Sequence, residues 1–161
     1  MVMLALMLGC KKTEPMTGVL IHTSIEFSIV DADGNDLLDP RTEHGINPAD
    51  IRVYYLKEGK LEEVYDSRLD DPRNFSIRAP GQYAGPDTGY RMRVIVNSPE
   101  SITGSSETHI QWGELGRDII HAEFRGSPSF SVLMVNKVWL NGDAIWDLDK
   151  EVSDAHFTLV K

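Results

Sequence analysis

The sequence is poor in cysteine and in positive charge, and it has no long hydrophobic run. Cys10 is the only cysteine in 161 residues, so the chain cannot form an internal disulfide. Lys and Arg number 16 against 25 Asp and Glu, which gives a net charge of −9 at pH 7. This balance argues against nucleic-acid binding, which depends on basic side chains that neutralise phosphates. The apolar stretch at the start of the chain is too short to cross a bilayer, which requires about 20 residues.

That stretch covers residues 1–10 and ends in Gly9-Cys10. Its length is typical of the hydrophobic region of a secretory signal peptide. The stretch resembles the end of a bacterial lipoprotein signal, in which a small residue precedes a cysteine that is lipidated and becomes the new N-terminus. The resemblance implies that residues 1–9 are removed, that Cys10 carries the lipid, and that residues 10–18 form a flexible tether. The alternative is a hydrophobic N-terminus with a free thiol.

The rest of the chain alternates apolar and polar residues with the period of two that is typical of half-buried β-strands. Asn141-Gly142 is a strong signal for a two-residue hairpin turn. We therefore predict an all-β fold, a single antiparallel β-sandwich over residues 19–161, of either the immunoglobulin-like or the transthyretin-like kind. The predicted strands are residues 19–30, 51–57, 61–66, 75–79, 90–96, 101–112, 117–125, 130–140 and 155–161. Residues 130–140 differ from the rest in being nearly all apolar, as in a strand that is buried on both faces.

Three segments together resemble a known group of proteins. They are Phe27-Ser-Ile-Val-Asp-Ala-Asp-Gly-Asn-Asp-Leu-Leu-Asp-Pro40, the Ile-Arg-Val-Tyr-Tyr run at residues 51–55, and Val138-Trp-Leu-Asn-Gly142. This combination is similar to small envelope lipoproteins of Bacteroidetes-type bacteria. The resemblance implies a β-sandwich held at the cell envelope, on the periplasmic or the surface side of the outer membrane. It implies no particular chemistry.

The connection over residues 31–50 is longer than a β-protein needs and is rich in carboxylates. Asp31-x-Asp33-x-Asn35 has the spacing of an EF-hand calcium loop, but Asp36 stands where that loop requires Gly and Thr42 where it requires Glu. Calcium is the one cofactor that the sequence suggests, and the alternative is a solvated acidic loop. The candidate cation ligands are Asp31, Asp33, Asn35, Asp36 and Asp39.

A topological argument extends this hypothesis. If every connection reverses the strand direction, the loops after Val30, Asp66, Asn97, Arg125 and Trp146 share one end of the sandwich. That end would be acidic and would lie opposite the tether. Loops of one sign of charge favour a cation or a partner of the other sign.

The closing hairpin offers a second candidate site. A two-residue turn at Asn141-Gly142 places Trp139 opposite Ala144 and Lys137 opposite Trp146. This register predicts that Trp139 and Trp146 lie on the same face. Either that face is exposed and the two indoles, with Lys137, form a platform for a sugar, or it belongs to the core.

Catalytic motifs are absent from the sequence. There is no nucleophile elbow, no glycine-rich phosphate loop and no histidine spacing typical of zinc sites. We therefore predict a non-catalytic, lipid-anchored envelope protein that acts as a binding or structural accessory module for a glycan or a protein partner. The alternatives are a small carboxylate-dependent hydrolase on a β-sandwich and a purely architectural envelope subunit.

Overall fold

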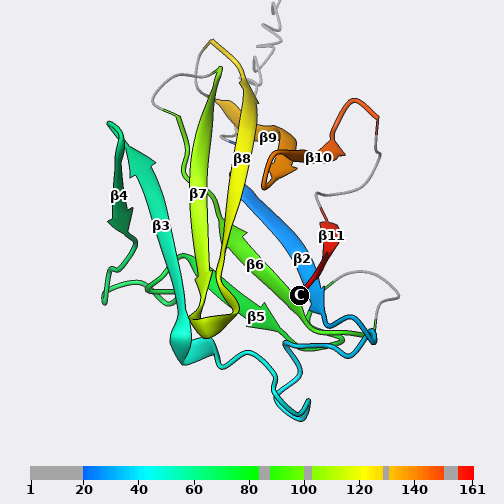
Figure 1. The fold of residues 1–161 in the computed structure, drawn as a ribbon. Helices are drawn as coiled ribbons and strands as arrows, with labels where there is room; N and C mark the ends of the chain where they lie inside the picture. The colour runs from blue at the N-terminus through cyan, green and yellow to red at the C-terminus, as the bar shows by residue number, and fades with distance from the viewer. Residues whose placement is uncertain (1–19, 84–87, 100–102, 129–130, 151–155) are drawn as a thin grey trace, which may run out of the picture.

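The computed structural model describes residues 20–83, 88–99, 103–128, 131–150 and 156–161 (Figure 1). The predicted signal peptide, Cys10 and the tether lie outside these ranges. Within the ranges, no helix is long and apolar enough to cross a membrane. The helical elements there are two single 3-10 turns, η1 at Pro48–Asp50 and η2 at Gly113–Leu115.

The described residues form an all-β sandwich of two sheets (Figure 1). The seven-stranded sheet has the order β1-β9-β8-β7-β3-β4, and β10 also pairs with β9. The four-stranded sheet has the order β11-β2-β6-β5. The strands are β1 Leu20–His22, β2 Ser24–Val30, β3 Ile51–Lys57, β4 Lys60–Glu63, β5 Phe75–Arg78, β6 Arg91–Ile95, β7 Gly104–Trp112, β8 Arg117–Gly126, β9 Val132–Leu140, β10 Asp143–Asp147 and β11 His156–Val160.

The core between the sheets follows the predicted alternation. Ile25, Phe27 and Ile29 of β2 are almost fully buried, as are the apolar positions of β3, β6, β7 and β8. The Phe27 ring stacks on Phe157 of β11 at 5.2 Å between centroids and meets Trp112 of β7 edge-on at 6.0 Å. Phe27 therefore joins the two sheets at the centre of the cluster.

Two edge pairs are parallel, which corrects the prediction of a purely antiparallel sandwich. β1 pairs in parallel with β9, and β11 pairs in parallel with β2. Each of these strands is separated from its partner by a change of sheet, so no tight hairpin imposes an antiparallel pairing. The first predicted strand, residues 19–30, accordingly splits at Thr23, and Ile21 is exposed on β1 instead of buried.

The predicted grouping of the loops is also wrong. The Tyr90 backbone N–H donates to Asp36 Oδ2 at 2.7 Å, so the 31–50 connection lies at the same end as the connection that precedes β6. The predicted alternation of the loops between the two ends of the sandwich fails between β4 and β5. There the chain changes sheet without reversing its direction (Figure 1).

The 31–50 connection nevertheless lies far from the point where the described chain begins. β8 starts beside η2, which faces Asp50, and ends beside the turn after Gly126. At that turn the Leu20 backbone N–H donates to the Ser131 carbonyl at 2.7 Å. A strand of ten residues spans about 30 Å. The chain therefore enters at one end of the sandwich, and residues 44–50 lie at the other.

Candidate ligand-binding cleft

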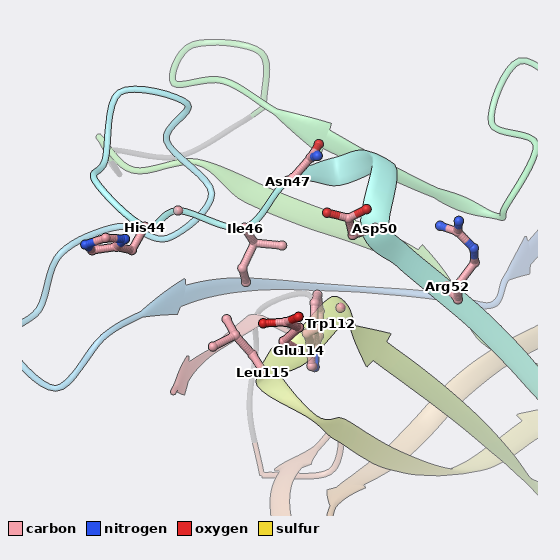
Figure 2. Close-up of a pocket in the computed structure, with 10 residues that line it drawn as sticks. His44, Ile46, Asn47, Asp50, Arg52, Trp112, Glu114 and Leu115 are labelled. Carbon is pink, nitrogen blue, oxygen red and sulfur yellow. The ribbon is translucent and has the colours of Figure 1, made fainter.

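A cleft of about 660 Å³ opens at the end of the sandwich opposite Leu20, and Figure 2 shows the residues that line it. One wall is the segment that leads through η1 into β3, and the other is the turn between β7 and β8. We call it the distal cleft. It is lined by His44, Gly45, Ile46, Asn47, Asp50, Arg52, Trp112, Gly113, Glu114 and Leu115.

Local sequence signals build both walls. Asn47 caps η1 by accepting a hydrogen bond from the Ala49 N–H at 3.0 Å, and Pro48 occupies the first position of the turn. On the other wall the Trp112 N–H donates to the Gly116 carbonyl at 2.9 Å, which closes the turn into β8. The walls meet at Gly113, whose φ is 59° and where an added Cβ would lie 3.3 Å from the Asp50 Cβ. A side chain at position 113 would therefore be disfavoured both by the left-handed backbone and by the close approach to Asp50.

The floor of the cleft is apolar. Ile46 and Trp112 close it from below, and Trp112 is only 2% exposed, whereas Leu115 at the side is 49% exposed. The Trp112 indole Nε1–H donates to Asp118 Oδ2 at 2.7 Å, and Lys161 Nζ lies 5.8 Å from the centroid of the indole ring. These contacts fix the orientation of the indole.

Two carboxylates point into the cleft from opposite walls, Asp50 from η1 and Glu114 from η2 (Figure 2). Within the part of the chain that the structure describes, neither carboxylate accepts a hydrogen bond or forms an ion pair. Arg52, by contrast, is occupied, because its Nη1 donates to the carbonyls of Ala49 and Ile51 and its Nε lies 3.4 Å from a Glu63 oxygen. The unpaired charge of the cleft is therefore negative.

Three of the four carboxylates that the sequence singled out, those of Asp31, Asp36 and Asp39, are bound by nearby N–H groups or by Arg41 instead of facing a common point. The Asp31 carboxylate accepts hydrogen bonds from the Asn35 Nδ2–H at 2.8 Å, the Asn35 N–H at 2.8 Å and the Asp33 N–H at 2.9 Å. These bonds, led by the one from the Asn35 side chain, lower the pKa of Asp31. The Asp33 side chain is exposed on the turn that these bonds close.

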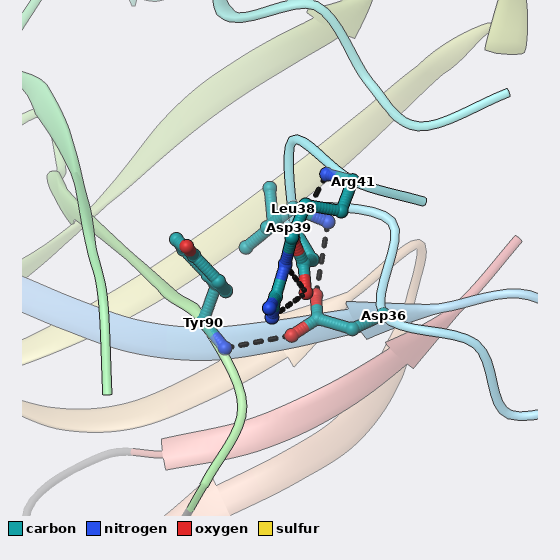
Figure 3. A network of polar contacts seen from close by, with 5 residues as sticks. All are labelled: Asp36, Leu38, Asp39, Arg41 and Tyr90. Atoms are coloured by element: carbon teal, nitrogen blue, oxygen red, sulfur yellow. Dashed lines mark hydrogen bonds and ion pairs between the residues drawn. The ribbon is translucent and has the colours of Figure 1, made fainter. Parts of the chain in front are cut away.

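Asp36 and Asp39 make similar contacts (Figure 3). Asp36 Oδ1 accepts from the Leu38 N–H at 2.9 Å, while its Oδ2 binds Tyr90. Asp39 pairs with Arg41 at 2.7 Å, and hydrogen bonds from Arg41 lower the pKa of Asp39. In the described ranges, no three His, Cys, Asp or Glu side chains gather as a metal ion would require. Calcium binding by this loop stays a prediction.

The closing hairpin departs from the predicted register. Trp139 does pair with Ala144, but Trp146 pairs with Val138, because a β-bulge inserts Ile145 as an extra residue. The prediction that Trp139 and Trp146 share a face is therefore wrong. Trp146 is buried with Val138 in the core, while Trp139 is half-buried on the outer face.

A smaller hollow of about 330 Å³ still brings the three predicted platform residues, Lys137, Trp139 and Trp146, to one place. Its Trp139 ring meets His121 edge-on at 5.3 Å. Lys150 lies 3.4 Å from Asp147, and both residues also line the hollow. Of the two indoles, that of Trp139 is the more exposed, because Trp146 is only 6% exposed.

Sequence reasoning did not select Asp50 and Glu114 as a pair. They are far apart in the chain and line the same cleft because Ile51 of β3 pairs with Trp112 of β7. A long-range register of this kind leaves no local pattern in the sequence. A scan of protein-family models, a search of curated proteins and a search of solved structures gave no match to this chain. The geometry of the distal cleft is therefore the main indication of its function.

Proposed function

We propose that the protein is a lipid-anchored envelope protein that acts as a non-catalytic binding module. In this proposal Cys10 carries the lipid, and the distal cleft receives a glycan or a segment of a partner protein. The observation that carries the proposal is the position of the cleft. It opens at the end of the sandwich opposite Leu20, the first described residue after the tether. An anchor at Cys10 would hold the cleft away from the bilayer.

The lining of the cleft supports binding. Sites for small groups combine an apolar surface with a few polar groups that orient the ligand. Here Ile46, Trp112 and Leu115 supply the apolar surface, while Asp50 and Glu114 supply hydrogen-bond acceptors. The exposed Leu115 gives a ligand apolar area to cover.

One observation favours a second candidate function, a carboxylate-dependent hydrolase. Asp50 and Glu114 line the same cleft, and most glycoside hydrolases place two carboxylates on either side of the scissile bond. In that case one residue would act as the acid and the other as the base or the nucleophile. This function requires turnover, so an assay for released sugar separates it from binding.

The test is a thermal-shift screen of the full chain against envelope glycans and peptides, followed by variants of the cleft. A ligand of the native state raises the melting temperature. We expect at least one ligand to do so with the unmodified chain and to lose the effect with Leu115→Lys. Leu69→Lys is the matched control, because Leu69 is 50% exposed and does not line the cleft.

Ligand effects that survive Leu115→Lys would contradict a role for the cleft. Cleavage of a glycan that is lost in Glu114→Gln would replace the binding function with the hydrolase.

A further inference from the structure

Resting on the proposed binding function, we infer that the distal cleft takes a basic side chain, an arginine, from a partner protein. The guanidinium would lie between Asp50 and Glu114, and the aliphatic stem would cover Leu115. Three features of the cleft lead to this choice: its unpaired charge, its apolar wall and its buried indole.

The charge of the cleft fits a cation. Asp50 and Glu114 enter from opposite walls, and no described residue pairs with either carboxylate. Arg52 is held by Glu63 and by two backbone carbonyls, so it leaves the negative charge of the pair uncompensated. His44 also lines the cleft, but its ring is highly exposed and lies 3.6 Å from Glu43. A guanidinium presents donors on two edges and can bind two carboxylates at once.

The apolar lining fits the stem of a long basic side chain. Arginine buries its methylene groups along apolar surface while its charged end binds acceptors. Leu115 is the exposed apolar residue next to Glu114, and the buried Ile46 also lines the cleft. An arginine that fills such a pocket is a common anchor of protein interfaces.

The buried indole argues against an amino sugar, the other cation of suitable size. Sugars bind aromatic side chains through an exposed ring face, but Trp112 is 2% exposed, and Asp118 holds its indole N–H. The distal cleft therefore offers a sugar ring no aromatic face. The exposed leucine suits an alkyl stem better.

The charge of the whole protein would assist a basic partner. A net charge of −9 attracts a positively charged surface and accelerates encounter at low ionic strength. Asp31, Asp36 and Asp39 are held by N–H groups or by Arg41, so their carboxylates are less available to a cation than those of Asp50 and Glu114.

The test is a calorimetric titration of the full chain with acetyl-Gly-Arg-Gly-amide. The same peptide with citrulline, the neutral isostere of arginine, is the matched ligand, and glucosamine is the competing cation. We expect the arginine peptide to bind about tenfold more tightly than the citrulline peptide, because charge-assisted hydrogen bonds are roughly twice as strong as neutral ones. Added salt should weaken the arginine complex.

The variants Asp50→Asn and Glu114→Gln should each weaken binding of the arginine peptide by about tenfold. Asp143→Asn, a change of an exposed carboxylate on the closing hairpin, should leave it unchanged. Because the Asp50 and Glu114 carboxylates hold no other group, we expect both variants to fold. The comparison of arginine with citrulline uses the unmodified chain and does not depend on them.

Equal affinity for the arginine and citrulline peptides would overturn the inference, as would the absence of binding to the folded chain. Binding of glucosamine, but not of the arginine peptide, that depends on Asp50 and Glu114 would assign the cleft to an amino sugar. That outcome would overturn the inference and leave the proposed binding function intact. The proposed function itself fails if no ligand in the thermal-shift screen depends on the cleft, or if the cleft cleaves a glycan.

Discussion

Replacement of Asp118 by alanine is expected to lower the free energy of unfolding by about 3–5 kcal/mol, the range for removal of one partner of a buried ion pair. Asp118 is 5% exposed. Its carboxylate binds Lys161 Nζ at 2.5 Å, the Trp112 Nε1–H at 2.7 Å and the Asn141 Nδ2–H at 3.0 Å. The alanine variant leaves the buried Trp112 indole N–H and the largely buried Lys161 ammonium without their acceptor, whereas the exposed Asn141 can turn to water.

A double-mutant cycle measured by urea denaturation distinguishes this network from simple loss of packing. Lys161→Met should also destabilise the fold, because it leaves the Asp118 carboxylate buried without its cation. The double variant should then be more stable than the sum of the two single losses predicts. Strictly additive losses would contradict coupling between Asp118 and Lys161.

The network also gives a pH dependence. Burial alone would raise the pKa of Asp118, but hydrogen bonds from Asn141, Lys161 and Trp112 outweigh it and lower the pKa below the ordinary value of 3.8. The unfolded chain therefore binds this proton more readily than the folded chain does. The stabilisation that the Asp118 carboxylate contributes is complete above its pKa in the unfolded chain. It is lost as the pH falls through its pKa in the folded chain. The stability gap between the unmodified chain and Asp118→Asn should narrow on acidification, and a constant gap would contradict the assignment.

Replacement of Phe27 by alanine is expected to cost about 3–5 kcal/mol, as large-to-small changes of buried aromatic residues do. Phe27 is almost fully buried, and its ring contacts Phe157 and Trp112 on different sheets. Loss of the ring leaves a cavity where the sheets meet, and chemical denaturation measures the cost.

Phe27→Leu is the matched control, because leucine keeps most of the apolar volume and should cost clearly less than alanine. If both substitutions changed stability by less than about 1 kcal/mol, Phe27 would not join the sheets as the structure indicates.

The alternation of apolar residues predicts the strands well because burial of one strand face acts locally. Ile25, Phe27 and Ile29 face the core as their spacing of two requires, and β3, β6 and β8 behave in the same way. The bulge at Ile145 is different, because one extra residue reverses the faces of the following residues without changing the local pattern. Trp146 therefore lies in the core, although Trp139 does not.

The distal cleft escapes sequence analysis for another reason. Asp50 and Glu114 come together through the pairing of Ile51 with Trp112, a contact between strands that are distant in the chain. The acidic loop has the residue spacing of a cation site. Spacing alone does not reveal that the Asp31 and Asp36 carboxylates accept hydrogen bonds from neighbouring N–H groups. Turn chemistry and metal binding use the same residue types.

In the proposed function, a lipid at Cys10 holds the sandwich with its cleft turned away from the bilayer. Leu20 lies beside the turn that follows β8, and Leu115 lies in the turn at the opposite end of β8. Because Cys10 is the only native cysteine and would be acylated, one introduced cysteine can be labelled selectively. Leu115→Cys marks the cleft, and Pro128→Cys marks the turn near the entry point.

The decisive measurement is energy transfer from each label to a headgroup dye in membranes that carry the lipidated protein. We expect clearly weaker transfer from position 115 than from position 128, because β8 spans about 30 Å between the two ends. We also expect Cys10→Ser to abolish transfer from both labels. Equal or stronger transfer from position 115, or transfer that persists in Cys10→Ser, would show that the lipid does not hold the cleft away from the bilayer.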